Sequence, residues 1–201
     1  MINYNEDYLD TLVVMESLKG YASPKSKLTR MLRDEELLRV RRGLFLPPGA
    51  NYSVRTLANM IYGPSYISFE YALAYYGLIP ERVVSVTSAA YGKNKHKRFD
   101  TPVATFTYRT IPEAVFPLAV RRIEQDQNPY LIATAEKALC DTLYLNRRVG
   151  SLDQLSELLY GDLRVDIGAL SEFDVDVVSK LAPLYGKKVL KLFAGLLERG
   201  F

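Results

Sequence analysis

The sequence has no tryptophan, a single cysteine (Cys140) and a single histidine (His96) among its 201 residues. A lone cysteine cannot form an internal disulfide, which favours a protein of the reducing cytoplasm. The sequence contains neither Cys/His spacing typical of a metal site nor a glycine-rich phosphate loop. No hydrophobic run approaches the length of a membrane helix, and the start is the polar, acidic stretch MINYNEDYLD, which is no signal peptide. We therefore expect a cytoplasmic protein with no metal, no cofactor and no membrane attachment.

The same shortage of reactive side chains argues against an enzyme. Cys140 and His96 could form a nucleophilic dyad, but Cys140 falls in the apolar register of a predicted helix, where a free cysteine usually behaves as a small hydrophobe. Glu136 and Asp141 could be paired carboxylates, but their spacing of five points them to different helix faces and favours salt bridges. We expect no catalytic residues, and an enzyme with an unrecognised site remains only a third hypothesis.

The composition is that of an ordinary globular protein, with 48% hydrophobic and 24% charged residues. Its length fits one large domain or two small ones. The turn-forming residues Pro47, Pro48, Gly49 and Asn51 predict a boundary. We therefore divide the chain into a domain of residues 1–49 and a domain of residues 50–201.

Residues 23–33 predict a short basic helix. Ser23 can cap its first turn, and Pro24 suits its first helical position. Leu28 and Met31 fall on one face at helical spacing. The opposite face is small and basic, which suits a helix that enters the DNA major groove, where arginine can bond a guanine edge through two hydrogen bonds. The predicted operator contacts of this helix are Lys25, Ser26, Lys27, Thr29, Arg30 and Arg33.

Residues 38–46 predict a tight hairpin directly after this helix. Leu38 and Val40 alternate with basic residues, as in a half-buried strand. Gly43 can take the positive φ that the turn requires. The outward basic positions, which we predict to contact DNA as well, are Arg39, Arg41 and Arg42. A helix followed by a basic two-stranded hairpin is the order of a winged helix-turn-helix.

Positive charge is concentrated in this part of the chain. Residues 21–48 carry seven basic and three acidic side chains, a net charge of +4, whereas the whole chain carries +3, so the other residues sum to −1. A local excess of positive charge on a helix and hairpin of this size indicates contact with phosphates. The alternative is that these basic residues form the solvated charged face that any soluble helix carries. The basic hairpin that follows the helix favours DNA binding.

A first helix is predicted from Asn5 to Lys19, with its apolar stripe formed by Tyr8, Leu12 and Met15 and widened by Leu9 and Val13. A standard winged domain has three helices, but only two precede this hairpin. The third is therefore expected at residues 53–62, after the hairpin.

The remainder predicts a mixed domain. A helix is expected at residues 68–76 with Ser68 as its cap, followed by strands at 83–88, 99–103 and 105–108. Further helices are predicted at residues 134–146, 151–160, 174–184 and 187–198. The overall class is α+β: an N-terminal winged helix-turn-helix, then a mixed α/β C-terminal domain with a small antiparallel sheet and C-terminal helices. The last amphipathic helix can cap the core or pair with a second copy of the chain, including on DNA.

A second basic cluster lies in the turn YGKNKHKRF. It consists of Lys93, Lys95, Lys97 and Arg98. This cluster is either a second phosphate contact or a solvated hairpin tip, and the sequence does not decide between them.

Several blocks resemble the AbiEi-type antitoxins of bacterial abortive-infection toxin–antitoxin systems. SPKSKLTRMLRDEELLRVRRGLF resembles the winged module of this family. SYISFEYALAYYGLIPERVVSVTSA, KRFDTPVATFTYRTIP and YLIATAEKALCDTLYL resemble its C-terminal region in the same order, so the resemblance covers most of residues 21–146. It implies a transcriptional autorepressor that binds its own operator DNA. It also implies an antitoxin that counters a nucleotidyltransferase-like toxin without a stable complex.

A second hypothesis is a protein-interaction module in which a degenerate winged helix does not bind DNA. Salt-dependent DNA binding separates the two, because counterion release makes affinity fall steeply with salt.

Overall fold

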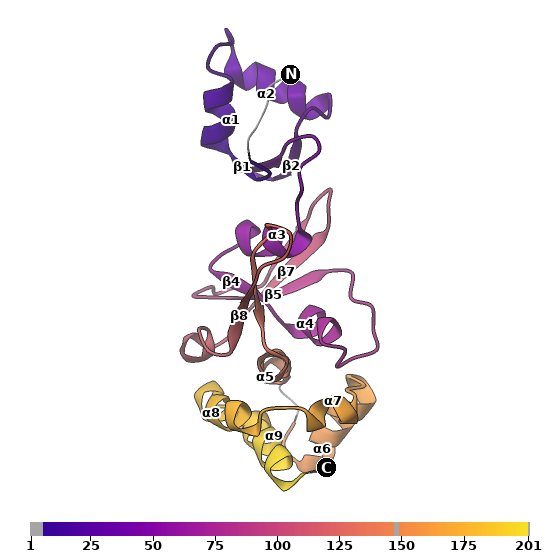
Figure 1. The fold of residues 1–201 in the computed structure, drawn as a ribbon. Helices are drawn as coiled ribbons and strands as arrows, with labels where there is room; N and C mark the ends of the chain where they lie inside the picture. The colour runs from indigo at the N-terminus through magenta and orange to yellow at the C-terminus, as the bar shows by residue number, and fades with distance from the viewer. Residues whose placement is uncertain (1–5, 147–148, 201) are drawn as a thin grey trace.

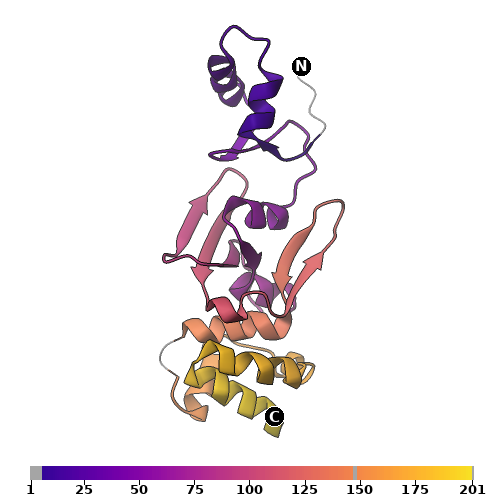
Figure 2. The ribbon, with the colours of Figure 1, turned by 90° about the vertical axis from the view of Figure 1, so that its left-hand side faces the viewer.

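The computed structural model describes residues 6–146 and 149–200 as an elongated stack of layers. An N-terminal module lies at one end, a six-stranded sheet lies in the middle, and a group of C-terminal helices lies at the other end (Figures 1 and 2). The predicted α+β class is confirmed. The expected small antiparallel sheet of the C-terminal domain is wrong, because the sheet there is larger and mixed.

The N-terminal module contains two helices and a small antiparallel sheet. In chain order its elements are β1 (Leu9–Asp10), α1 (Thr11–Ser17), α2 (Pro24–Arg33), β2 (Leu38–Arg41) and β3 (Leu44–Leu46). The strands are ordered β1-β3-β2, so the hairpin formed by β2 and β3 is joined by a short strand from before the helices. The buried side chains of this module form the small N-terminal cluster: Leu9, Val14, Leu18, Met31, Leu37 and Phe45.

The predicted first helix starts later than expected. Its proposed start, Asn5, lies outside the described residues, and residues 9–10 pair with β3 as a strand. The Asp10 carboxylate accepts a hydrogen bond of 2.8 Å from the Val13 N–H and caps α1. The predicted stripe is therefore only partly right: Leu9 is buried, but Leu12 is 78% exposed and Val13 is exposed too, whereas Val14 is buried. Because Leu9 is part of a strand, helix α1 begins after it. This start determines which face of α1 turns inward.

The hairpin turn forms as predicted, with Gly43 at φ +86°. The β2 strand is irregular, because its register against β3 shifts between Arg39 and Arg41. A bulge of this kind breaks the alternation of side chains. Val40 is buried as expected, but Leu38 is exposed.

The inner side of the hairpin packs into the main core of the protein. Val40, Leu44 and Leu46 belong to the same buried cluster as residues of α3 (Val54–Ile61) and of the central sheet. The predicted helix at residues 53–62 is confirmed as α3, capped by the Ser53 side chain. It contacts β4, β5 and β9 of the central sheet. Helix α3 thus covers the sheet instead of completing the N-terminal pair of helices.

The central sheet has the strand order β6-β7-β5-β4-β9-β8. The β7/β5 and β4/β9 pairs are parallel and the other three pairs are antiparallel. The strands are β4 (Ser65–Ile67), β5 (Val86–Ala90), β6 (Lys97–Asp100), β7 (Thr105–Thr110), β8 (Val120–Ile123) and β9 (Tyr130–Ala133), and a short 3₁₀ helix η1 (Glu113–Val115) follows β7.

Helices cover both faces of this sheet. On one face, the Tyr108 hydroxyl of β7 donates to the Ala58 carbonyl of α3 at 2.7 Å. On the other, the Tyr66 hydroxyl of β4 reaches the Asp141 carboxylate of α5 at 2.9 Å. Helix α5 (Ala135–Leu145), predicted with Thr134 as its cap, is confirmed, and α4 (Phe69–Tyr75) packs beside it.

Strand prediction was partly right. The strand expected at 83–88 is β5, shifted toward the C-terminus, and Val84 is 81% exposed. The strands expected at 99–103 and 105–108 are β6 and β7. The sequence analysis missed β4, β8 and β9, each of which is only three or four residues long.

The C-terminal helices pack beneath α5 (Figure 2). The predicted helix at 151–160 forms as α6 (Leu152–Ser156), which continues as the π-helical segment η2 (Glu157–Asp162). The helices expected near the end are α8 (Val175–Tyr185) and α9 (Lys188–Arg199), and the short α7 (Ile167–Ser171) was missed. The apolar face of α9 is buried within its own chain, so it caps the core. Within the described residues, no helix has both the length and the apolarity needed to cross a bilayer.

Candidate nucleic-acid interface

Helix α2 presents the predicted small-and-basic face. Pro24 occupies its first turn as predicted, but Ser23 makes no side-chain cap. The Ser23 hydroxyl instead donates to the Ser26 hydroxyl at 2.8 Å. Met31 is buried, and Leu28 packs against the N-terminal cluster. The helix is therefore held by its apolar stripe, which leaves the other face to solvent.

Most of the predicted contact residues of α2 are exposed. They are Lys25, Ser26, Thr29, Arg30 and Arg33. Lys27 differs, because its side chain is only 19% exposed. Its ammonium group pairs with Glu36 at 3.1 Å and lies 5.8 Å from the centre of the Tyr21 ring. Lys27 therefore fastens α2 to the following turn.

The exposed cations of α2 are not equally available for a ligand. Two guanidinium nitrogens of Arg33 bond the Asp34 carboxylate at 2.7 and 3.3 Å, and this hydrogen bonding lowers the pKa of Asp34. By contrast, Lys25 and Arg30 form no ion pair and no side-chain hydrogen bond with any residue that the structure describes. Arg30 is thus the arginine on this face whose guanidinium is unoccupied.

The three hairpin arginines also differ in how available they are for a ligand. Arg39 and Arg42 are exposed and form no ion pair within the described ranges. Arg41 is half-buried, and its Nε is enclosed without a hydrogen-bond partner there. Burial raises the pKa of Tyr108 in the central sheet, and the positive charge of Arg41 opposes that rise. Arg41 therefore faces the sheet, unlike Arg39 and Arg42.

The second basic cluster is not brought next to α2. Lys95, Lys97 and Arg98 are exposed, while Lys93 is half-buried with its ammonium group 5.1 Å from the centre of the Tyr62 ring. Lys97 and Arg98 line a pocket together with residues of α5 and of the segment before α9. The lining residues place the pocket where the sheet meets the C-terminal helices. Helix α2 lies at the far end of the molecule (Figure 2).

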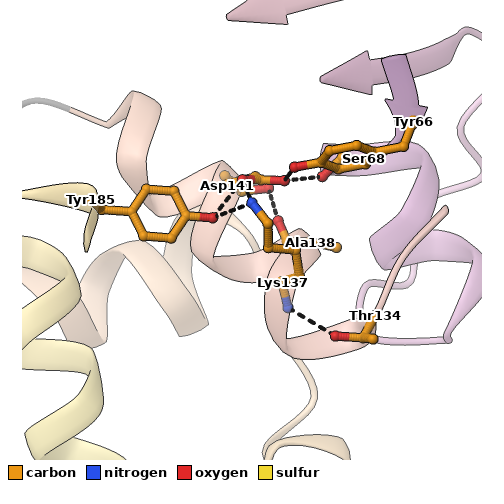
Figure 3. A network of polar contacts seen from close by, with 8 residues as sticks. Tyr66, Ser68, Thr134, Lys137, Ala138, Asp141 and Tyr185 are labelled. Atoms are coloured by element: carbon orange, nitrogen blue, oxygen red, sulfur yellow. Dashed lines mark hydrogen bonds and ion pairs between the residues drawn. The ribbon is translucent and has the colours of Figure 1, made fainter. Parts of the chain in front are cut away.

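The sequence analysis did not identify a buried polar network centred on Asp141 of α5 (Figure 3). One carboxylate oxygen, Oδ1, accepts from the Lys137 ammonium group at 2.6 Å and from the Tyr185 hydroxyl at 2.5 Å. The other, Oδ2, accepts from the hydroxyls of Tyr66 at 2.9 Å and Ser68 at 2.7 Å. Lys137 also donates to the Tyr185 hydroxyl at 2.6 Å. The network joins β4, α5 and α8.

This network is closed to solvent. The side chains of Lys137 and Asp141 have no exposed surface, and burial lowers the pKa of the Lys137 ammonium group. A ligand has no access to these groups, so we assign the network a role in holding the layers together. Its sequence signal was the i,i+4 spacing of a lysine and an aspartate inside a mostly apolar helix.

Cys140 is buried in α5, and burial raises the pKa of its thiol. His96, its hypothetical partner in a nucleophilic dyad, is exposed in the turn before β6. An enclosed thiol that is held protonated is a poor nucleophile. In the part of the chain that the structure describes, no three His, Cys, Asp or Glu side chains gather as a metal site.

No family model matches the chain. A search of curated proteins also found no match.

Proposed function

We propose that the chain is a DNA-binding transcriptional regulator that reads operator DNA with α2. The observation that carries the proposal is the exposed face of α2, where small side chains flank the unoccupied guanidinium group of Arg30. Small residues permit close approach to a groove, and a free arginine can form two hydrogen bonds to guanine.

The order of elements supports a winged helix-turn-helix that lacks its first helix. In this assignment β1 joins the wing sheet, α1 supports the recognition helix α2, and β2 and β3 form the wing. Arg39 and Arg42 of the wing then contact backbone phosphates beside the groove. The position of the module at one end of the molecule leaves α2 free of the other layers (Figure 1).

We further propose that this regulator is an antitoxin that represses its own promoter and counters a nucleotidyltransferase-like toxin without forming a stable complex. The support is the resemblance of the blocks in residues 21–146 to AbiEi-type antitoxins. Co-expression of the chain with the product of an adjacent gene tests this part: rescue of growth supports it, and unchanged toxicity contradicts it.

The decisive experiment for DNA binding is an anisotropy titration of the full chain with the DNA upstream of its own gene and with scrambled DNA of equal length, each at two salt concentrations. We expect tighter binding to the upstream DNA and a steep loss of affinity with salt. Absence of binding at low salt would contradict the proposal.

A specific observation favours a second candidate, a protein-interaction module. Leu12 and Val13 of α1 are exposed apolar residues on adjacent positions of the N-terminal module. If DNA does not bind, a partner protein that covers these side chains becomes the leading hypothesis, and Leu12→Ser would weaken that contact.

A further inference from the structure

Strand β8 forms one edge of the central sheet, because it is the last strand in the order and pairs only with β9 among the described strands. The hairpin of β8 and β9 is the outermost element on its side of the molecule (Figure 2). The open side of an edge strand presents unpaired backbone groups to which a strand of another chain can add. We call the open side of this strand the β8 edge.

Two hydrogen bonds fix the register of the β8–β9 hairpin at its two ends. The Thr134 N–H donates to the Ala119 carbonyl at 2.9 Å. The Asn128 N–H donates to the Gln125 carbonyl at 2.7 Å, so the ladder runs on past the last residue of β8. Because every second residue of an antiparallel strand bonds its partner, the odd-numbered residues from 119 to 125 bond β9. The even-numbered residues therefore point their N–H and C=O groups toward the open β8 edge.

Three consecutive residues make the β8 edge complementary to itself. Arg122 and Glu124 carry opposite charges on one face of the sheet, and Ile123 lies between them on the other face. Around a twofold axis through Ile123, two antiparallel β8 edges place Arg122 of each copy opposite Glu124 of the other. The outward N–H and C=O groups of these two residues then pair across the axis, and Ile123 meets its own copy.

Other registers of two β8 edges are less favourable. An axis through Arg121, Arg122 or Glu124 places two like charges directly opposite each other, which destabilises a sheet. An axis through Val120 leaves Arg122 opposite residue 118, which lies before β8. The charges along the strand therefore select the axis through Ile123.

The charged groups at this axis are available for a partner. Arg122 and Glu124 pair within the chain at 2.7 Å, but their side chains are 64% and 61% exposed. Solvent screens an exposed pair of this kind, so it contributes little by itself. Across the twofold axis the pairs of the two copies join into one network of alternating charges, which is the arrangement in which surface pairs do contribute.

Strand β6, at the other edge of the sheet, is less suited to the same association. It carries the similar sequence Arg98, Phe99, Asp100. The Asp100 carboxylate, however, already accepts hydrogen bonds from Arg98 at 2.8 and 3.0 Å and from the Thr105 hydroxyl at 2.8 Å. Lys97 adds an exposed positive charge, and an edge lysine disfavours the addition of another strand.

We propose that two copies of the chain associate through their β8 edges around a twofold axis at Ile123, so that their central sheets become one continuous sheet. The contact is short, so the association is reversible and depends on concentration. It does not depend on DNA binding, because β8 lies in the middle layer and α2 lies at one end of the molecule (Figure 1).

Disulfide trapping with Ile123→Cys tests the axis directly. Residues directly opposite in an antiparallel pair have Cβ atoms about 4.5–5.5 Å apart, near the distance that a disulfide requires. The natural Cys140 is buried and does not compete. On non-reducing gels of the mildly oxidised full chain, we expect mostly dimer for Ile123→Cys and monomer for Arg121→Cys. In this register the two copies of position 121 lie about 13 Å apart along the strands. Equal trapping at both positions would overturn the proposal.

Sedimentation velocity over a concentration series measures the association without a cross-link. Arg122→Glu and Glu124→Arg should each weaken it by about tenfold, because like charges then lie opposite each other. The double variant Arg122→Glu, Glu124→Arg restores opposite charges across the axis and should recover most of the affinity. Arg98→Glu is the matched control, because it makes the same change of charge at the other edge of the sheet, and it should have no effect. Circular dichroism establishes that each variant is folded.

Three outcomes would overturn the proposal. The first is a chain that stays monomeric at its highest soluble concentration. The second is equal weakening by Arg98→Glu and Arg122→Glu, which would show an effect of net charge alone. The third is a dimer that neither Arg122→Glu nor Glu124→Arg weakens, which would place the contact on another surface.

Discussion

The Lys137 ammonium group and the Asp141 carboxylate form an ion pair of 2.6 Å in which neither side chain reaches solvent. Removing one partner of such a pair leaves the other charge buried and uncompensated, which typically costs about 3–5 kcal/mol. We expect Asp141→Ala to lower the free energy of unfolding by this amount, measured by urea denaturation. The double variant Lys137→Met, Asp141→Leu should lose less than Asp141→Ala alone, because it leaves no unpaired charge.

The exposed pair of Lys19 and Glu16 is the control for this experiment. Glu16→Gln should leave the urea midpoint unchanged, since solvent screens that pair. If Asp141→Ala were tolerated as well as Glu16→Gln, the network would have no role in holding the layers together.

The stability of the protein should fall at alkaline pH. Burial raises the pKa values of the Cys140 thiol and of the Tyr66 and Tyr185 hydroxyls above their ordinary values of 9.0 and 10.0. In the unfolded chain these groups lose their protons near the ordinary values, so the folded state binds more protons above them and stability decreases as pH rises. Each group contributes a slope of about 1.4 kcal/mol per pH unit.

Lys137 acts in the opposite sense. Burial lowers its pKa, so below its ordinary value of 10.5 the unfolded chain binds more protons, and this group alone makes stability rise with pH. Above pH 10.5 the contribution of Lys137 to stability no longer changes with pH, so the loss of stability with rising pH should steepen. Tyr66→Phe should reduce the fall of stability with pH above pH 10.0 by the contribution of one titrating group. Tyr52→Phe, at an exposed position, should not. Urea denaturation at stepped pH values measures both slopes, and identical slopes in the two variants would contradict this account.

Arg30→Ala should weaken operator binding more than binding to scrambled DNA. A guanidinium that bonds a base edge contributes about 1–3 kcal/mol of discrimination, whereas a phosphate contact contributes equally to every sequence. Anisotropy titrations with the two DNAs give the ratio of the two affinities directly. Lys95→Ala serves as the control, since it removes one positive charge at an exposed position away from α2. A ratio unchanged in Arg30→Ala would remove α2 as the reading helix.

Arg41 and Arg42 are adjacent in sequence and should behave differently. Arg42 is exposed at the turn, so Arg42→Ala should reduce the salt slope of DNA binding by about one. Arg41→Ala should leave the slope unchanged, because Arg41 faces the sheet near Tyr108. Titrations over a range of salt concentrations measure both slopes. A smaller slope in Arg41→Ala would show that Arg41 contacts phosphate as well.

The sequence predicted elements whose signals are local. The basic helix was identified by its spacing and by Pro24, the hairpin turn by Gly43, and α5 by the cap at Thr134. The hydrogen bond from the Lys137 N–H to the Thr134 hydroxyl oxygen, at 3.3 Å, joins residues only three positions apart. Such contacts depend on neighbouring residues alone, so a pattern in the chain is enough to find them.

What the sequence did not predict depends on contacts between distant residues. The inward turn of Arg41 requires the bulge in β2 and the sheet beyond it, and neither has a local signature. The partners of Asp141 come from positions 66, 68 and 185, far along the chain in both directions. The pocket that Lys97 and Arg98 line likewise includes Lys187, ninety positions after Lys97 in the sequence. Its single local sign was the basic turn, for which the sequence left two interpretations open.

The hydrophobic side chains of the N-terminal module are divided between two clusters. Those of α1 and α2 pack in the small N-terminal cluster, whereas Val40, Leu44 and Leu46 of the hairpin belong to the main core. Because local opening follows the amount of apolar surface that holds a segment, the two helices should exchange their amide hydrogens at a lower free energy than the hairpin. The hairpin would then stay folded on the sheet while α1 and α2 open and re-form, so that the two parts of one small module differ in stability.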